Sequence, residues 1–169
     1  MVLGGQYLER PALIRCGSLT LEGLFHRGER APPLVLCPPH PAYGGSMDSP
    51  VLAECAWAAS RAGHATLRFN YRGVGAAVGH VRERAGGAAS AVAGYSFGAR
   101  VALGRALRDP RIDRLVLISP PVGLFDFSAL ASFDRPVLVV AGREDALVDR
   151  ERLRALLEPL GGRPSREWI

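Results

Sequence analysis

The stretch Gly94-Tyr95-Ser96-Phe97-Gly98 decides the fold of this chain. The apolar run 89–94 leads into it, and a helical pattern with small residues on one face, 97–108, follows it. A serine between such a strand and helix sits on a sharp, strained turn, so the positions two before and two after it must be small. We predict that this turn lifts the Ser96 hydroxyl out of the carboxyl edge of a sheet and aims the helix N-terminus at it. The alternative is a chance pentapeptide in a glycine-rich loop.

Strands and helices alternate along the rest of the sequence. Two short runs separated by Gly17-Ser18 predict an antiparallel hairpin, and Pro33–Cys37 is a continuous apolar run typical of a strand covered on both faces. The alternation implies right-handed βαβ crossovers and a doubly wound, mostly parallel α/β sheet in a single domain, residues 1–169. The expected strands are 12–16, 19–27, 33–37, 64–70, 89–94, 112–119, 136–141 and 165–169, and the expected helices are 50–62, 97–108 and 149–160.

Composition narrows the function classes. With 48% hydrophobic and 22% charged residues, the chain has the make-up of a soluble globular protein, and no apolar run reaches the roughly 18 residues that span a bilayer. The N-terminus has no signal-peptide pattern, so we expect a cytoplasmic protein without a membrane partner. All 21 basic residues are arginines, spread along the chain among acids, which predicts solvated faces rather than a nucleic-acid site. Steering of an anionic substrate by the net charge of +5 stays open.

Neither metal nor cofactor binding is indicated. The three cysteines (Cys16, Cys37 and Cys55) form no C-x-x-C pair, and we expect them to be structural. The four histidines show no metal-ligand spacing. A nucleotide-binding or redox domain of the Rossmann type is disfavoured, because no G-x-G-x-x-G follows the first parallel strand.

Acyl transfer at Ser96 requires hydrogen-bond donors for a developing oxyanion. The backbone N–H of Phe97, the residue after the nucleophile, is one candidate. The second should come from the loop after the earlier strand, where three of the four residues 38–41 are prolines without an N–H. We therefore nominate the amide of His40, rather than its imidazole. The alternative is a rigid proline-rich loop with an incidental histidine.

Several motifs in the same order resemble one family. The segment 36–48, L-C-P-P-H-P-A-Y-G-G-S-M-D, resembles the H-P-x-x-G-G-x-M-D loop of a small bacterial α/β-hydrolase group near the dienelactone-hydrolase-like and prolyl-oligopeptidase-like esterases. Residues 67–75 resemble its strand and R-G-x-G turn, 93–99 its nucleophile elbow, and 138–148 its G-x-x-D-x-x-V acid loop. The resemblance covers about residues 12–169 and implies an α/β-hydrolase fold; it is specific for the superfamily and weakly specific for substrate.

The resemblance assigns the acid of a catalytic triad to Asp145, which would fix the tautomer of a histidine and stabilise its imidazolium. A solvated loop acid paired with Arg143 is the alternative. We expect Tyr43, Tyr95 and Phe125 to line the substrate site. Phe125 belongs to the loop 120–134, which is too short for a large cap domain and therefore indicates small or openly accessible substrates. Core packing accounts equally well for the phenylalanines of that loop.

Two departures from the family pattern stand out. No histidine follows Asp145, although the family order is serine, acid, histidine. The segment 79–89 is short and contains Gly86-Gly87, so we expect a crossover helix to be missing there. Both departures suggest that parts of a longer protein are absent after residue 169 and between about 79 and 89. Of the histidines present, His80 is the best substitute base, expected on a loop at the carboxyl edge; a solvated surface role is its alternative.

Two functions therefore compete. The first is a carboxylesterase-like serine hydrolase that forms an acyl-enzyme on Ser96 with a small acyl substrate as its partner. Here Asp145 orients a histidine beyond these residues. The second is a non-catalytic α/β-hydrolase-like binding protein that lacks the catalytic histidine. Without an imidazole, the Ser96 hydroxyl is a poor nucleophile, and this difference decides between the two.

Overall fold

A computed structural model describes residues 9–71, 73–160 and 164–168. Its helices and strands follow the alternation that the sequence predicts. The elements are β1 (Arg10–Cys16), β2 (Leu19–His26), β3 (Arg30–Cys37), α1 (Pro50–Arg61), β4 (His64–Phe69), α2 (Val74–Arg84), β5 (Ser90–Tyr95), α3 (Phe97–Ala106), β6 (Ile112–Ile118), β7 (Val137–Ala141), α4 (Arg150–Leu157) and β8 (Pro164–Trp168), with short 3-10 helices η1 (Pro41–Tyr43), η2 (Ser128–Ser132) and η3 (Glu158–Leu160).

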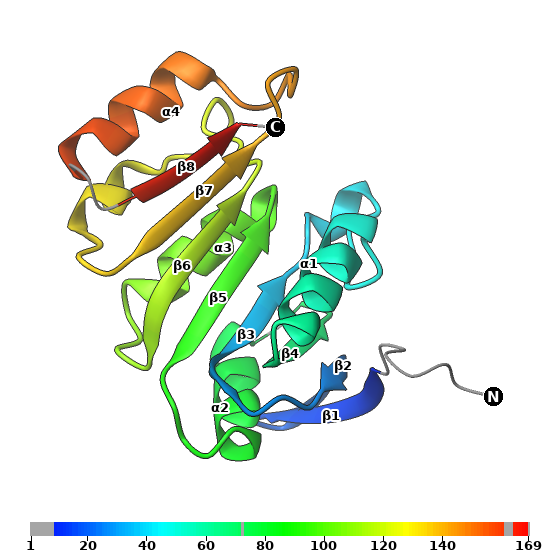
Figure 1. Ribbon diagram of the computed structural model, residues 1–169. Coiled ribbons are helices and arrows are strands. Elements are labelled where there is room, and N and C mark those ends of the chain that lie inside the picture. The colour runs from blue at the N-terminus through cyan, green and yellow to red at the C-terminus, as the bar shows by residue number, and fades with distance from the viewer. Residues whose placement is uncertain (1–8, 72, 161–163, 169) are drawn as a thin grey trace.

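The strands form one twisted sheet in the order β1-β2-β4-β3-β5-β6-β7-β8 (Figure 1). The β1–β2 and β2–β4 pairs are antiparallel, and the remaining pairs are parallel. One core cluster joins α2, α3 and α4 to one face of the sheet, and a smaller cluster joins α1 to the other. The expected doubly wound α/β fold with an N-terminal hairpin and no cap is confirmed, as is the strand at the C-terminal end.

The crossover between β4 and β5 corrects one expectation. We expected a missing helix between residues 79 and 89, but α2 spans Val74–Arg84 and makes the crossover. The helix begins inside the glycine-rich turn, where Gly73 adopts a φ of 117° before its first residue. Gly86 and Gly87, with φ of 70° and 80°, follow the helix and do not interrupt it. Among the crossovers between parallel strands in the described residues, the one from β6 to β7 lacks an α-helix and holds only η2.

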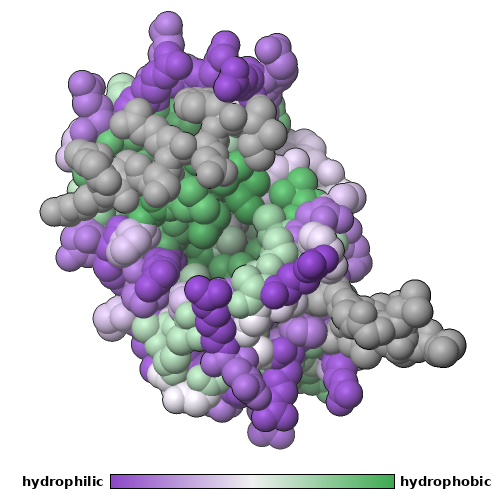
Figure 2. All heavy atoms as spheres, in the orientation of Figure 1, coloured by the Kyte–Doolittle hydropathy of each residue, from purple (hydrophilic) through white to green (hydrophobic). Residues whose placement is uncertain are grey.

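The two faces of the sheet differ in how well they are covered. Along β6 and β7, the side chains of Leu115, Leu117, Val137 and Val139 are buried, whereas their neighbours on the opposite face are partly exposed. Figure 2 shows this apolar surface in the hollow beside α1. At the centre of the sheet, β3 is buried on both faces, as its continuous apolar run predicts. Among the described residues, no helix is long and apolar enough to cross a membrane.

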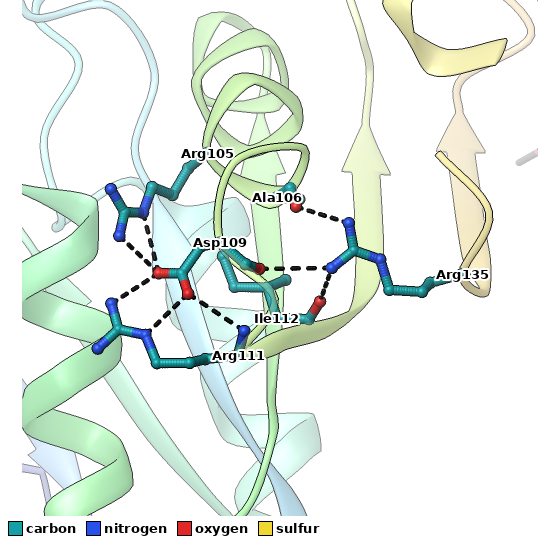
Figure 3. Close-up of polar contacts among 6 residues, drawn as sticks. All are labelled: Arg105, Ala106, Asp109, Arg111, Ile112 and Arg135. Atoms are coloured by element: carbon teal, nitrogen blue, oxygen red, sulfur yellow. Dashed lines mark hydrogen bonds and ion pairs between the residues drawn. The ribbon is translucent and has the colours of Figure 1, made fainter. Parts of the chain in front are cut away.

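A buried carboxylate ties the amino ends of β6 and β7 to α3 (Figure 3). Asp109 is 3% exposed, and its oxygens accept hydrogen bonds from Arg105 and Arg111 at distances of 2.6–3.1 Å. These hydrogen bonds hold the pKa of the Asp109 carboxyl well below its usual range. Arg135, which precedes β7, donates to the carbonyl oxygens of Ala106, Asp109 and Ile112. The cluster lies at the amino-terminal ends of the strands, and the turn at Ser96 lies at their carboxyl-terminal ends.

Replacing this carboxylate should destabilise the fold in a pH-dependent way. We expect Asp109→Asn to lower the free energy of unfolding at pH 7 by about 2–4 kcal/mol, because two arginines lose their shared anion. A depressed pKa in the folded state stabilises the protein above the carboxyl's unfolded pKa, near 4, and this stabilisation is lost as the pH falls towards the folded value. The difference between the two proteins, measured by urea unfolding, should therefore shrink below about pH 4.

Asp134→Asn is the matched control. Asp134 is 83% exposed and lies 3.5 Å from Arg135, so its removal should change the free energy of unfolding by less than about 0.5 kcal/mol. Equal effects of the two substitutions would contradict the structural role of Asp109.

Candidate active site

Ser96 lies in the sharp turn between β5 and α3. Its backbone has φ 55° and ψ −121°, a conformation that costs a residue with a side chain on the order of 1–3 kcal/mol. Two backbone hydrogen bonds hold the turn: the Ser96 N–H donates to the carbonyl oxygen of Ile118 at 2.9 Å, and the Ala99 N–H donates to that of Ser96 at 2.9 Å. The predicted strained turn at the carboxyl edge of the sheet is therefore present.

The flanking glycines are required by close backbone contacts. A Cβ on Gly94 would lie 2.1 Å from the carbonyl oxygen of Gly98. A Cβ on Gly98 would lie 2.2 Å from the carbonyl oxygen of Cys37 and 2.5 Å from that of Pro38. Real Cβ atoms do not approach other atoms so closely, so the turn and the end of β3 fit together only with glycine at both positions.

The two predicted oxyanion donors lie on adjoining segments. Phe97 is the first residue of α3, so its N–H has no acceptor within the helix, and the helix dipole favours negative charge there. His40 follows β3 and precedes η1, and its ring packs against that of Phe97 with centroids 4.5 Å apart. The loop of His40 therefore lies against the N-terminus of α3, and the role of the two amides as oxyanion donors stays a prediction.

The imidazole of His40 is oriented by its own loop. Its Nδ1 accepts a hydrogen bond from the N–H of Ala42 at 3.1 Å. An amide nitrogen can only donate, so in neutral His40 the Nδ1 carries the lone pair and the Nε2 carries the proton. The Nε2 of neutral His40 is therefore a hydrogen-bond donor. A general base for Ser96 must instead accept a proton, so His40 in this tautomer cannot serve as one.

A pocket of about 730 Å³ opens beside Ser96. It brings together five of the residues nominated with Ser96 from the sequence: Phe97, His40, Tyr43, Tyr95 and Phe125. Its described lining consists of Pro39, His40, Tyr43, Gly44, Gly45, Ser49, Pro50, Tyr95, Ser96, Phe97, Pro121, Leu124, Phe125 and Leu147, none of which is an aspartate, glutamate or arginine. The pocket is therefore apolar around a polar centre, although the chain is rich in arginine.

Leu124 and Leu147 are large apolar lining residues that sequence reasoning missed. Their side chains are 66% and 53% exposed, and that of Tyr43, on the same pocket, is 89% exposed. Large exposed apolar side chains gathered on one pocket are typical of a binding site. Each lies close to a residue nominated from the sequence: Leu124 directly precedes Phe125, and Leu147 lies two residues after Asp145.

Asp145 lies in the loop that follows β7. Its Oδ1 accepts a hydrogen bond from the Leu147 N–H at 3.0 Å, and its own N–H donates to the carbonyl oxygen of Gly142 at 3.3 Å. The side chain is half-buried and is not part of the described lining of the Ser96 pocket, but its neighbour Leu147 is. Its role as triad acid stays a prediction.

The expected location of His80 is wrong. We expected a loop at the carboxyl edge, but His80 lies in α2, because that helix begins at Val74. Its side chain is buried and packs against the ring of Phe25 in the N-terminal hairpin, with centroids 6.4 Å apart. Burial lowers the pKa of His80, and Arg84 lowers it further. Among the described residues that line the Ser96 pocket, His40 carries the only imidazole.

A buried thiol lies directly before the loop that carries His40. Cys37, at the end of β3, is fully buried, and burial raises the pKa of its thiol to about 12, so it stays protonated at neutral pH. In the described part of the chain, no group of three or more histidine, cysteine, aspartate or glutamate side chains is placed to hold a metal ion.

The chain resembles known proteins in both sequence and structure. The chain is 31% identical to RP471, an uncharacterized protein of Rickettsia prowazekii, over 168 positions that cover 86% of this chain and 71% of the relative. A structure described as an α/β serine hydrolase homologue from Coxiella burnetii matches with a TM-score of 0.83 and 26% identity, covering 97% of this chain and 89% of its own. The chain belongs to the α/β-hydrolase superfamily.

Two further structures show how widely this superfamily fold is shared. XC6422 of Xanthomonas campestris, described as a serine hydrolase without a lid, matches with a TM-score of 0.79 and 26% identity over 95% of this chain and 83% of its own. The esterase Pf2001 of Pyrococcus furiosus matches with a TM-score of 0.77 over 96% of this chain and 82% of its own; at 16% identity, it shows the fold alone. No family model matches the sequence.

The glycine contacts of this α/β-hydrolase elbow generate a direct test. We expect Gly98→Ala to lower the free energy of unfolding by about 3 kcal/mol or more, because its Cβ meets backbone atoms that cannot move away. Gly104→Ala, in the same helix, meets only the flexible end of Arg100 and should stabilise the protein by up to about 1 kcal/mol. Urea unfolding followed by circular dichroism measures both, and a harmless Gly98→Ala would contradict the contact.

Proposed function

We propose that this chain is a carboxylesterase-like serine hydrolase that cleaves small neutral esters through an acyl-enzyme on Ser96. The observation that carries the proposal is the strained Ser96 turn, which opens into an apolar pocket beside the first amide of α3. The serine hydrolase descriptions of two structural neighbours, each 26% identical to this chain, support the reaction class.

In the proposed reaction, the Ser96 Oγ attacks the ester carbonyl carbon while a base takes the hydroxyl proton. The carbonyl oxygen becomes an oxyanion held by the backbone N–H groups of Phe97 and His40. Collapse of this intermediate breaks the bond to the alcohol, which leaves with the proton from the base and leaves the acyl group on Ser96. Water then repeats the attack with the same base, releasing the acid and restoring the serine.

The base is the incomplete part of this mechanism. None of the four histidines follows Asp145. The histidine on the described lining of the pocket is His40, and in its neutral form Nε2, the nitrogen that would have to accept the Ser96 proton, already carries one. Turnover at a useful rate therefore requires an imidazole from elsewhere, held by Asp145. The same observation favours a second candidate function, a binding protein that uses the apolar pocket without chemistry.

Added imidazole distinguishes the two candidates. When imidazole is added, we expect Ser96 to react with a fluorophosphonate and hydrolysis of p-nitrophenyl butyrate to rise about 10- to 100-fold, because general-base catalysis contributes on the order of 10²–10⁴. Ser96→Ala should abolish both the labelling and the enhancement above the background reaction. Labelling is measured by intact mass, and hydrolysis by absorbance.

Ser119→Ala is the control for this experiment, since Ser119 also has a positive φ, of 44°, but lies outside the described lining of the pocket. Its labelling should match that of the unmodified chain. A folded protein that is neither labelled nor stimulated by imidazole would refute the hydrolase and support the binding protein.

The apolar lining predicts which acyl groups are accepted. We expect p-nitrophenyl butyrate to be preferred over p-nitrophenyl hemisuccinate by at least tenfold in kcat/KM, because burying a carboxylate without a partner is costly. Leu147→Arg, at an exposed position on the pocket, should reduce this preference about tenfold. Leu13→Arg, 74% exposed on β1 and outside the described lining, should leave it unchanged. An unchanged preference in Leu147→Arg would contradict the assignment of the pocket.

A further inference from the structure

The loop that carries His40 is held by side chains from the end of β4. We propose that Asn70, Arg68 and Tyr71 are positioning residues that hold the His40 loop, residues 38–49, against the Ser96 turn. The inference rests on the proposed function for its catalytic consequence. Its structural part concerns how the loop is fixed, and it stands on hydrogen bonds at both ends of the loop.

At the far end of the loop, both backbone polar atoms of Met47 are bound by side chains of β4 and of the residue that follows it. The Met47 N–H donates to Oδ1 of Asn70 at 2.9 Å. Its carbonyl oxygen accepts a hydrogen bond from the guanidinium of Arg68. A residue bound through both its N–H and its carbonyl oxygen cannot shift along either direction without breaking a partly buried hydrogen bond, which costs more than an exposed one.

At the near end, the loop is bound through Pro38. The hydroxyl of Tyr71 donates to the carbonyl oxygen of Pro38. The Tyr71 ring also packs edge-on against Phe97, with centroids 5.8 Å apart, and against Phe69 at 6.4 Å. Tyr71 therefore touches both the loop with one oxyanion donor and the residue with the other. Burial raises the pKa of the Tyr71 hydroxyl, which keeps it a donor.

The side chains of Arg68 and Asn70 each have a carboxylate partner of their own. Arg68 is buried and donates from its Nε to Oε1 of Glu9 at 2.8 Å, with a second hydrogen bond from its guanidinium to the same carboxylate. Asn70 donates from its Nδ2 to Oε1 of Glu22 at 2.7 Å, which fixes which end of the amide faces Met47. Partners of this kind lock a side-chain rotamer and so give the loop a rigid support.

The loop transmits its anchorage to His40 because it is internally closed. The carbonyl oxygen of His40 accepts hydrogen bonds from the N–H groups of Tyr43 and Gly45, both at 3.1 Å. Gly45 packs so closely that a Cβ there would lie 2.5 Å from the backbone of Pro39. Movement at Met47 or Pro38 therefore moves His40, and an oxyanion donor is effective only within about 2.7–3.1 Å of its target.

Asn70→Ala tests the proposal by two independent readouts. Hydrogen exchange of the segment 38–49, measured by mass spectrometry, should become at least tenfold faster, because Met47 loses its acceptor. Hydrolysis of p-nitrophenyl butyrate with added imidazole should show kcat reduced about tenfold and KM unchanged, because the oxyanion donor acts in the transition state and the substrate pocket stays intact.

Ser60→Ala is the matched control. It removes one side-chain to backbone hydrogen bond, from Ser60 Oγ to the carbonyl oxygen of Ala56, at the far end of α1. Exchange in 38–49 and kcat should both stay as in the unmodified chain. If Asn70→Ala does not fold, Tyr71→Phe replaces it, because this change keeps the ring contacts and removes only the hydroxyl.

The outcomes separate the two proposals. Faster exchange confined to 38–49 together with a lower kcat supports the positioning role. Unchanged exchange in a folded Asn70→Ala variant overturns the positioning role, whatever the activity. A higher KM with an unchanged kcat overturns it as well. If the unmodified chain fails to react with a fluorophosphonate in the presence of imidazole, the proposed function fails, and the exchange experiment still decides whether these side chains hold the loop.

Discussion

The contact between Gly98 and the backbone at the end of β3 is the constraint on which the site depends. With a carbonyl oxygen 2.2 Å from where a Cβ would stand, α3 is seated directly on Cys37 and Pro38. The chain must therefore leave β5 and enter α3 within one residue, and Ser96 takes the strained backbone that results. The same contact sets the start of α3 next to the loop that carries His40, so the strain at Ser96 and the placement of the proposed nucleophile and oxyanion donors have one geometric origin.

Strain at Ser96 persists only because α3 is held at both ends. Its first turn is fixed by the hydrogen bond from Ser96 to Ile118 and by the glycine contacts. Its last residue, Ala106, accepts a hydrogen bond from Arg135, and Arg105 binds the buried carboxylate of Asp109. A helix anchored at its C-terminal end cannot relax by sliding away from β3. The ionic cluster at the amino ends of the strands thus supports the Ser96 turn at their carboxyl ends through the helix α3, without touching it.

The parts of this structure that the sequence predicts are those set by local signals. The pentapeptide around Ser96 marks the turn, and apolar runs mark the strands of the parallel sheet. Gly86 and Gly87 misled the prediction, since they end α2 and do not prevent it; the helix starts earlier, at Val74, which turns His80 towards the hairpin. The supports of the site were beyond sequence reasoning, because their partners lie far apart in the chain: 59 residues for Arg68 and Glu9, and 23 for Met47 and Asn70. Periodicity carries no information on such pairs.

The described residues include candidates for oxyanion donors but no candidate for the general base. The backbone amides that we propose as oxyanion donors lie on segments held by the Ser96 turn, by side chains at the end of β4 and by the closed loop. The hydrogen bond from Ala42 to Nδ1 of His40 occupies the acceptor nitrogen of the imidazole on the described lining of the pocket. Stabilising an oxyanion and taking a proton from Ser96 thus depend on different parts of the molecule. The amides proposed for the first belong to the described fold. In the proposed reaction, the second requires an imidazole oriented by Asp145, and this requirement is the chemical difference between a hydrolase and a pocket that only binds.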